Sequence, residues 1–194
     1  MNLNYAIFRS KPIMTIPYLA QIGSHNKREK KAYNSNHDIK QELSKNNIEL
    51  VPLTGKYVKG FYNLTNEYRE QHEEKQKTER TDRKKTFNQI LNKSRNVVGV
   101  ELLFTATSEF FKEMTVDDIK EWANTYMEFV YNDLGYTKEQ VLHSVVHLDE
   151  TTPHIHCVVV PLVKKFDERY TITKKEYIRI KYTYHNYKIS ITKD

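Results

Sequence analysis

Two apolar segments with a very short connection between them constrain the fold of this chain more than any other feature. Residues 142–149 and 154–162 are rich in Val, Leu and Ile and have the length of β-strands. Between them lie Thr151, Thr152 and Pro153, residues that are typical of a tight turn. A parallel pair of strands would need a crossover of a dozen or more residues. These segments are therefore predicted to form an antiparallel hairpin.

The remaining regular patterns predict a domain with both strands and helices. Residues 97–107 have the composition of a third strand. Thr115 and Asp118 form a capping-box-like start, apolar residues then recur at helical spacing, and Gly135 follows as a helix stop. We expect an antiparallel central sheet flanked by helices, in the α/β class and of the α+β kind.

Several other elements have weaker patterns. Pro and Gly mark their ends, and long polar runs indicate exposed helices. In the first half we expect a strand at 5–8 that ends before Pro12, a helical turn at 16–21 stopped by Gly23 and followed by a basic loop, and a short helix at 37–47. Residues 63–94 are expected to form one long helix, or two helices joined near Thr81 and Asp82. Near the C-terminus we expect an edge strand at 170–173 and a helix at 174–181.

The 194 residues suffice for one domain, and no apolar run is long enough for a membrane span. Cys157 is the single cysteine, which excludes an intrachain disulfide and favours a cytoplasmic location. Its place on the predicted strand favours a core position. The net charge of +6 is unevenly distributed. Residues 1–100 hold 19 Lys and Arg against 10 Asp and Glu, residues 101–162 hold 3 against 11, and residues 163–194 hold 9 against 4. Basic segments of this kind suit a nucleic-acid backbone, although solvated lysine-rich surfaces give the same pattern.

Three histidines of the predicted hairpin form a candidate metal site. His154 and His156 alternate with Ile155, so both imidazoles point to the same face of their strand. His147 stands near the end of the preceding strand, and the hairpin brings it across from that pair. Three imidazoles on one face leave open coordination positions for water and substrate, as a catalytic metal requires.

Two carboxylates adjoin the first of these histidines. Asp149 lies on the same strand face as His147, and we expect it to orient a ligand ring by a hydrogen bond. Glu150 is a candidate general base, and a role as a metal ligand is also open. The alternative for both residues is that they cap the turn.

The region from residue 75 to residue 95 is the most basic part of the chain. It holds eight Lys and Arg and two acidic residues, and a helix with this charge could follow a groove of DNA or be a solvated surface. The candidate DNA contacts here are Arg80, Arg83, Lys84, Lys85 and Arg95.

The motifs of this chain resemble those of one enzyme family. His-hydrophobic-His on a strand resembles the HUH endonucleases, and His-x-Asp-Glu-x-Thr-Pro-His-x-His at 147–156 is similar to the MobV, or Mob/Pre, plasmid mobilisation relaxases. The His25-Asn26-x-Arg28 string resembles a second motif of that family, and the stretch from Arg95 to Phe111 resembles its central region. The resemblance covers about residues 5–181, which we assign to a relaxase domain. Residues 182–194 would be a tail of uncertain structure.

The resemblance implies an activity. Relaxases of this family nick one strand at an origin of transfer by metal-assisted transesterification, and they remain attached to the DNA 5′ end until they rejoin it. The nucleophile that it implies here is His25, with Glu150 as its base. Tyr18 and Tyr33 remain alternative nucleophiles. Arg28 and Arg95 would contact phosphate, and Asn26 and Lys27 are counted with them as DNA contacts.

The resemblance also implies the metal and the partners. It favours Mn²⁺, with Mg²⁺ possible, whereas three imidazoles by affinity would take Zn²⁺, Ni²⁺ or Co²⁺. The expected substrate is origin DNA with a hairpin and an adjacent single strand, and longer family members work with the coupling protein of a conjugative system. Those members continue into a helical region, so we expect this chain to be an excised or naturally truncated domain. The competing interpretations are an origin-specific DNA-binding or repressor module with little nicking activity, and a three-histidine hydrolase unrelated to DNA.

Overall fold

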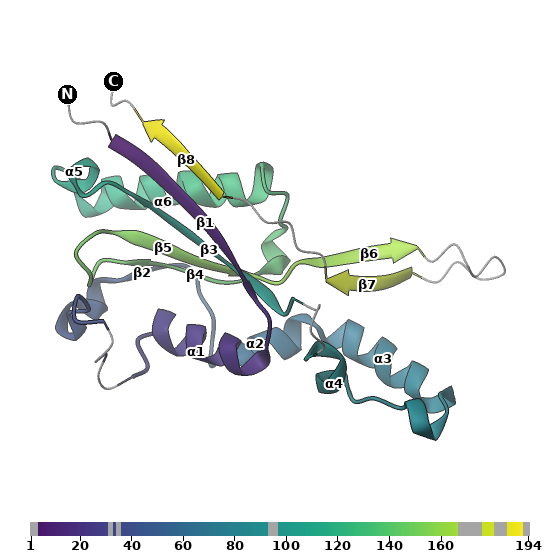
Figure 1. Ribbon diagram of the computed structural model, residues 1–194. Helices are drawn as coiled ribbons and strands as arrows, with labels where there is room; N and C mark the ends of the chain where they lie inside the picture. The colour runs from purple at the N-terminus through teal and green to yellow at the C-terminus, as the bar shows by residue number, and fades with distance from the viewer. Residues whose placement is uncertain are drawn as a thin grey trace.

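An antiparallel sheet with helices on both faces forms the centre of the molecule (Figure 1). The computed structural model describes residues 4–30, 33, 36–92, 97–166, 176–180 and 186–191. Within these residues, six strands pair in the order β2-β4-β5-β3-β1-β8, and each neighbouring pair is antiparallel. The expected architecture is confirmed. The strands of this sheet are β1 (Asn4–Ile13), β2 (Ile48–Val51), β3 (Gly99–Ala106), β4 (Val141–His147), β5 (His154–Val159) and β8 (Asn186–Ile191).

The predicted hairpin is β4 and β5, and it fixes which side chains reach each face. His147 pairs with His154, and Val146 pairs with Ile155. On the other side of β5, Leu103 of β3 pairs with His156. The alternation of side chains along each strand therefore sends the three histidines to one face and Ile155 to the other.

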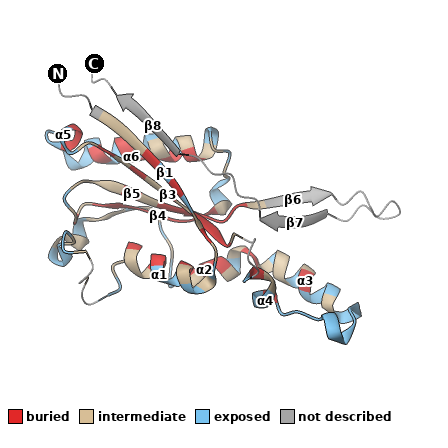
Figure 2. Cartoon of the chain, in the orientation of Figure 1, coloured by how far each residue is buried: buried red, intermediate tan, exposed pale blue. Residues whose placement is uncertain are grey.

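The face that carries Ile155 is covered by α5 (Ser108–Phe111) and α6 (Val116–Asn132). The Thr115 capping box at the start of α6 is present, and the helix buries the predicted apolar stripe through Ile119, Trp122 and Val130. Cys157 is fully buried in this layer, as its position on the strand predicts. Burial concentrates along the strands and on the inner sides of the helices (Figure 2).

The histidine-bearing face is covered by α1 (Ile16–Asn26) and α2 (Tyr57–Leu64). The expectation that Gly23 stops the first helix was wrong, because α1 continues to Asn26. A Cβ on Gly23 would lie 2.6 Å from the ring of Tyr57 in α2. Gly23 therefore permits the close packing of two helices and does not end one of them.

The first strand is longer than expected. β1 includes Pro12, which pairs with Val100. The other neighbour of β1, strand β8, pairs only with residues Asn4–Arg9. Pro12 therefore lies where β1 is an edge of the sheet, and an edge tolerates a residue that lacks a backbone N–H.

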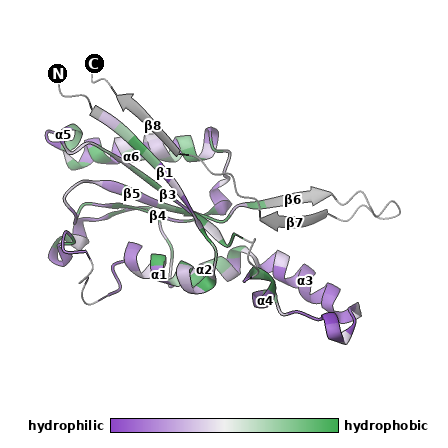
Figure 3. Cartoon of the chain, in the orientation of Figure 1, coloured by the Kyte–Doolittle hydropathy of each residue, from purple (hydrophilic) through white to green (hydrophobic). Residues whose placement is uncertain are grey.

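A polar arm extends from the histidine-bearing face. It consists of α3 (Asn66–Thr78), the 3-10 turn η2 (Thr81–Arg83) and α4 (Phe87–Leu91), so the expected break near Thr81 is confirmed. Its outer part is hydrophilic (Figure 3). At its base, Phe87 and Leu91 are buried in the same apolar cluster as residues of α2. The expected helix at 37–47 is reduced to the 3-10 turn η1 (Gln41–Asn46), and η3 (Lys138–Gln140) precedes β4.

The C-terminal region corrects one expectation and extends another. The helix expected at 174–181 was wrong, because β7 (Glu176–Ile180) is a strand paired with β6 (Leu162–Phe166). Strand β8 lies within the segment 182–194 that no pattern placed. The edge strand expected at 170–173 falls outside the described residues. In the part of the chain that is described, no helix could cross a lipid bilayer.

Candidate metal centre and active site

His147, His154 and His156 converge at the turn end of the hairpin. Their ring centroids lie 4.8 to 5.2 Å apart. One nitrogen of each ring donates to a protein acceptor: His147 Nε2 to Asn26 O at 3.0 Å, His154 Nδ1 to Thr152 O at 2.9 Å, and His156 Nδ1 to Glu101 Oε1 at 2.9 Å. These bonds fix the tautomers, as partners of metal-binding histidines usually do.

The opposite nitrogen of each ring is left to act as a ligand. His147 Nδ1 is buried and has no hydrogen-bond partner among the described residues. Burial lowers the pKa of His147 and of His156, and the neighbouring imidazoles lower both further. Neutral imidazoles suit a divalent cation, because only the neutral ring can bind one. Potential ligand atoms lie within 4.8 Å of one another in two groups, His147 with Glu150 and His154, and His147 with His25 and His156. His147 is thus common to both groups.

Helix α1 brings His25 to this cluster. Its ring centroid lies 5.7 Å from that of His147 and 5.4 Å from that of His156. One nitrogen from each of His25, His147 and His156 falls within a group no wider than 4.8 Å. His25 was expected in a basic loop, but it occupies the last turn of α1, since that helix runs past Gly23. Burial lowers the pKa of His25, and the charge of Arg28 lowers it further.

Arg28 connects the two carboxylates to this histidine. Its guanidinium donates to both oxygens of Asp149 at 2.7 Å and to Glu150 Oε1 at 2.6 Å. It also donates to His25 Nε2 at 3.2 Å. A guanidinium can only donate, so the proton of a neutral His25 sits on Nδ1 and the lone pair on Nε2. Arg28 therefore sets the tautomer of His25.

Asp149 and Glu150 occupy different places around the cluster. Asp149 has a fully buried side chain held by Arg28 and by the hydroxyl of Ser44. Burial raises its pKa, but these hydrogen bonds outweigh burial and hold the pKa below its usual value. Glu150 Oε1 lies 3.8 Å from His147 Nδ1 and 3.6 Å from His154 Nε2. Glu150 thus faces the nitrogens that are free to bind a metal.

The backbone at Arg28 is strained. Its φ of 52° is in the left-handed region, and among the described residues other than glycine it is the single positive φ. This position directly follows the C-cap Lys27 of α1, where glycine is usual. An arginine here costs about 1 kcal/mol or more in backbone energy, which the buried ion pairs offset.

The predicted DNA contacts fall into two groups. Asn26, Lys27 and Arg28 have partners inside the protein: Asn26 is buried, and Lys27 Nζ donates to Leu53 O at 2.7 Å and Gly55 O at 2.9 Å. These three residues hold the end of α1 in place. The structure thus gives each of the three side chains a partner within the protein, and their contacts with DNA stay a prediction.

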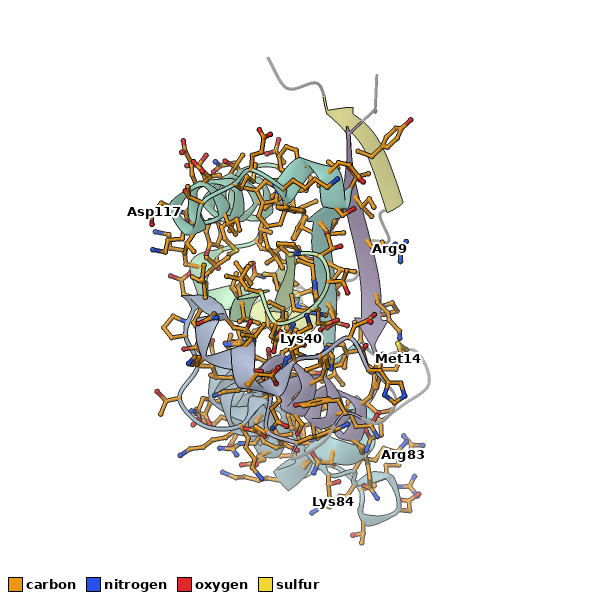
Figure 4. All side chains as sticks on the ribbon, turned by 90° about the vertical axis from the view of Figure 1, so that its left-hand side faces the viewer. Arg9, Met14, Lys40, Arg83, Lys84 and Asp117 are labelled. Atoms are coloured by element: carbon orange, nitrogen blue, oxygen red, sulfur yellow. The ribbon has the colours of Figure 1, made fainter. Side chains whose placement is uncertain are left out.

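The second group lies on the arm. Arg80 pairs with Asp82 at 3.2 Å, whereas Arg83, Lys84 and Lys85 are exposed and have no ion pair within the described part of the chain. Lys84 and Lys85 line a hollow of about 390 Å³ between α3 and α4. Arg83 and Lys84 lie at the opposite end of the molecule from Asp117 of the acidic helix α6 (Figure 4). Arg95 falls outside the described residues.

Comparison with known proteins decides the family. A family profile described as plasmid recombination enzyme, Mob_Pre, matches residues 2–193. The chain belongs to the Mob_Pre family. That match covers nearly the whole chain, including β8, and extends beyond the stretch in which the motifs were recognised.

Relatives within the Mob_Pre family agree with this assignment. The chain is 29% identical over 160 residues to plasmid recombination enzyme type 3 of Staphylococcus aureus, and 30% identical over 143 residues to the type 1 enzyme of that species. These alignments cover 82% and 74% of the chain, but 34% and 31% of those proteins. The chain spans about a third of their length.

A solved structure shares the fold. The Mn-bound crystal structure of the MobM relaxase domain with plasmid pMV158 oriT DNA superimposes with a TM-score of 0.64 at 23% identity. The match covers 82% of this chain and 71% of that one. A sheet with helices on both faces is therefore common to this Mob_Pre chain and to a relaxase domain.

Three residues that sequence analysis missed complete the site of this Mob_Pre chain. Glu101 of β3 is the acceptor of His156, and burial raises its pKa. Asn36 donates to Glu150 Oε2 at 3.1 Å, and Ser44 holds Asp149. The one signal for Glu101 is an acidic residue within an otherwise apolar strand. Asn36 and Ser44 lie more than 100 positions from their partners, so no local pattern could have found them.

Proposed function

We propose that this chain is the catalytic domain of a plasmid mobilisation relaxase that nicks one DNA strand at an origin of transfer in a bacterial cell. The observation that carries the proposal is the position of His25, which the fold brings from the end of α1 into the histidine cluster of the hairpin. A nucleophile beside a metal centre is the arrangement that covalent phosphoryl transfer requires.

His25 is the proposed nucleophile. The Nε2 lone pair of its imidazole accepts a hydrogen bond from the guanidinium of Arg28, and attack by this nitrogen requires that the hydrogen bond be released. In the reaction a ring nitrogen forms a bond to the scissile phosphorus, and the bond from phosphorus to the 3′ oxygen breaks. The ring loses its N–H proton, and the departing 3′ oxygen takes up a proton to become a hydroxyl. The 5′ phosphate stays on the protein as a phosphoramidate, and the reverse step rejoins the strand.

The donor set fits a divalent cation. His147, His154 and His156 would hold it, each with its second nitrogen already bonded to the protein. The cation would polarise the scissile phosphate and offset its developing negative charge. Mn²⁺ is the proposed metal because a relaxase domain of the same fold is Mn-bound, although imidazole ligands also accept Zn²⁺, Ni²⁺ or Co²⁺.

Glu150 is better suited to hold the cation than to act as the base expected from the sequence. Its Oε1 faces a free nitrogen of both His147 and His154, whereas its link to His25 runs through Arg28. We expect Glu150→Gln to weaken Mn²⁺ binding about tenfold in calorimetry, as loss of a charged metal partner does. Glu109→Gln, an exposed carboxylate on α5, is the control. Unchanged Mn²⁺ affinity together with loss of DNA cleavage would return Glu150 to the role of base.

A nicking assay tests the proposed function. The protein is incubated with Mn²⁺ and a supercoiled plasmid that carries the cognate origin, with and without a chelator. The expected products are relaxed circles with protein bound to one 5′ end, and the chelator should suppress them. Cleavage without a covalent adduct would instead indicate a metal-dependent hydrolase. Origin binding without cleavage would indicate the alternative, a DNA-binding module.

The arm is the proposed DNA-binding surface. Arg83, Lys84 and Lys85 are exposed and not engaged in ion pairs with described residues. Lys84 and Lys85 also line the hollow between α3 and α4. Each phosphate contact releases counterions and adds roughly one unit to the salt dependence of binding. We propose that these three side chains contact the phosphates of the origin hairpin.

Replacing Arg83, Lys84 and Lys85 with alanine should weaken binding to origin DNA and flatten the slope of log affinity against log salt by about two to three units. Fluorescence anisotropy over a salt series measures this slope. The matched control removes three other exposed lysines, Lys112, Lys120 and Lys138, which lie in the acidic segment. An equal effect of both triple variants would show that net charge alone, and no surface of the arm, determines binding.

A further inference from the structure

A network of polar side chains, buried except at exposed Glu49, leads from the edge of the sheet to the end of α1. Glu49 of β2 lies 3.0 Å from His143 Nε2 in β4, and His143 Nδ1 lies 2.6 Å from the hydroxyl of Tyr57 in α2. Asn26 Nδ2 lies 3.2 Å from the same hydroxyl. His143 and Tyr57 are at most 1% exposed. None of these contacts belongs to the proposed metal centre, yet the network of side chains ends beside it, at Asn26.

The direction of each hydrogen bond follows from chemistry. The amide nitrogen of Asn26 can only donate, so the oxygen of Tyr57 accepts there. The single proton of Tyr57 is then given to His143 Nδ1, and His143 must carry its own proton on Nε2, from which it donates to Glu49. Burial raises the pKa of Tyr57 and lowers that of His143, so both remain neutral. These four side chains, from Glu49 to Asn26, therefore have a single arrangement of hydrogen-bond protons.

Asn26 links this network of side chains to the proposed metal ligands. It is the last residue of α1, and its backbone oxygen is one of the helix-end carbonyls that lack a helical partner. That oxygen accepts the proton of His147 Nε2 at 3.0 Å, which leaves His147 Nδ1 free. Helix ends fray unless they are fixed. The position of the Asn26 carbonyl therefore decides which nitrogen of His147 is presented.

Packing alone does not explain a tyrosine at position 57. The ring of Tyr57 fills the space left by Gly23, and a phenylalanine ring would fill it equally well. A buried hydroxyl is unfavourable unless both of its hydrogen bonds are made. Here both are made, one to β4 and one to α1. The hydroxyl thus ties the end of the helix to the strand that carries His147.

We propose that Tyr57 and His143 are positioning residues that fix the last turn of α1, and through Asn26 the tautomer of His147. They touch neither DNA nor metal. The same turn carries His25, so the anchor also sets the place of the proposed nucleophile. This inference rests on the metal centre proposed above.

Tyr57→Phe tests the proposal. The variant keeps the ring against Gly23. It removes the hydroxyl that accepts from the Asn26 amide and donates to His143 Nδ1, so both groups lose a hydrogen bond. We expect the dissociation constant for Mn²⁺, measured by calorimetry without DNA, to rise about tenfold, as loss of an outer partner of a metal ligand does. The matched control is Tyr62→Phe, which also removes a tyrosine hydrogen bond of α2, to Asn88 at 2.6 Å on the surface. His143→Asn, which retains an acceptor near the Nδ1 position, should bind Mn²⁺ more tightly than His143→Leu.

The outcomes separate this inference from the proposed function. If the wild type binds no Mn²⁺, the metal centre itself is absent and both ideas fall. If the wild type binds and Tyr57→Phe binds within twofold of it, while its melting temperature falls, the hydroxyl is purely structural and the inference is overturned.

Nitrogen NMR of the wild-type histidines provides a test that needs no variant and remains valid if Tyr57→Phe does not fold. The proposal requires the Nε2–H tautomer for both His143 and His147. The Nδ1–H tautomer at His143 would exclude donation from Tyr57 and overturn it.

Discussion

Replacing His25 with alanine should abolish the covalent link between this protein and DNA, with cleavage reduced by about 1000-fold or more. Loss of a nucleophile has an effect of this size because the remaining groups cannot replace the bond that it forms. The measurement is the protein–DNA adduct on a denaturing gel after incubation with Mn²⁺ and origin DNA. His25 is half-buried and does not belong to either hydrophobic core cluster, so the variant should fold.

The control for this variant is His37→Ala, which removes an exposed histidine from a turn. Mn²⁺ affinity of His25→Ala must be measured as well, since His25 lies within one of the two groups that could hold a cation. Survival of the adduct in His25→Ala would transfer the nucleophile to a tyrosine. Tyr33 would then be tested first, because its ring centroid lies 6.0 Å from that of His25.

Arg28→Ala should lower the free energy of unfolding by about 3 to 5 kcal/mol. The change leaves the carboxylate of Asp149 buried without its cation, and an unpaired buried charge has a penalty of this order. The side chain of Arg28 is 5% exposed and that of Asp149 is fully buried, so solvent cannot replace the lost partner. Urea denaturation followed by circular dichroism measures the difference.

The backbone at Arg28 allows a sharper version of this test. Its φ of 52° disfavours alanine as well as arginine, whereas glycine adopts it readily. Arg28→Gly should therefore be about 1 kcal/mol more stable than Arg28→Ala, although both lack the ion pairs. Equal stability of the two variants would mean that the strained backbone relaxes once the guanidinium is gone.

The parts of the fold that were predicted correctly depend on local patterns. The hairpin of β4 and β5 follows from a three-residue turn motif between two apolar runs, and α6 follows from a cap and a helical stripe. The errors arose where tertiary contacts override such patterns. Gly23 looks like a helix stop until Tyr57 packs on it, and residues 176–180 look helical until β6 pairs with them.

The candidate site divides in the same way. His147, His154 and His156 could be grouped from the sequence because one hairpin holds all three. Their partners could not, because Asn26 and Glu101 reach them from α1 and β3. A sequence shows the charge of Arg28 but not the carboxylates that surround it, so its ion pairs with Asp149 and Glu150 could not be predicted. Its contact with DNA stays a prediction.

The sequence by itself thus determined the antiparallel hairpin, its three histidines on one face, the amphipathic helix behind them and the motifs of the Mob_Pre family. Only the tertiary structure decided that His25 joins that cluster and that Arg28 is used inside the protein. It also decided that Tyr57 anchors the end of α1. The physical reason is separation along the chain. Alternation and helical periodicity act over a few residues, whereas Arg28 and Asp149 are 121 positions apart and meet only when α1 packs on the finished sheet.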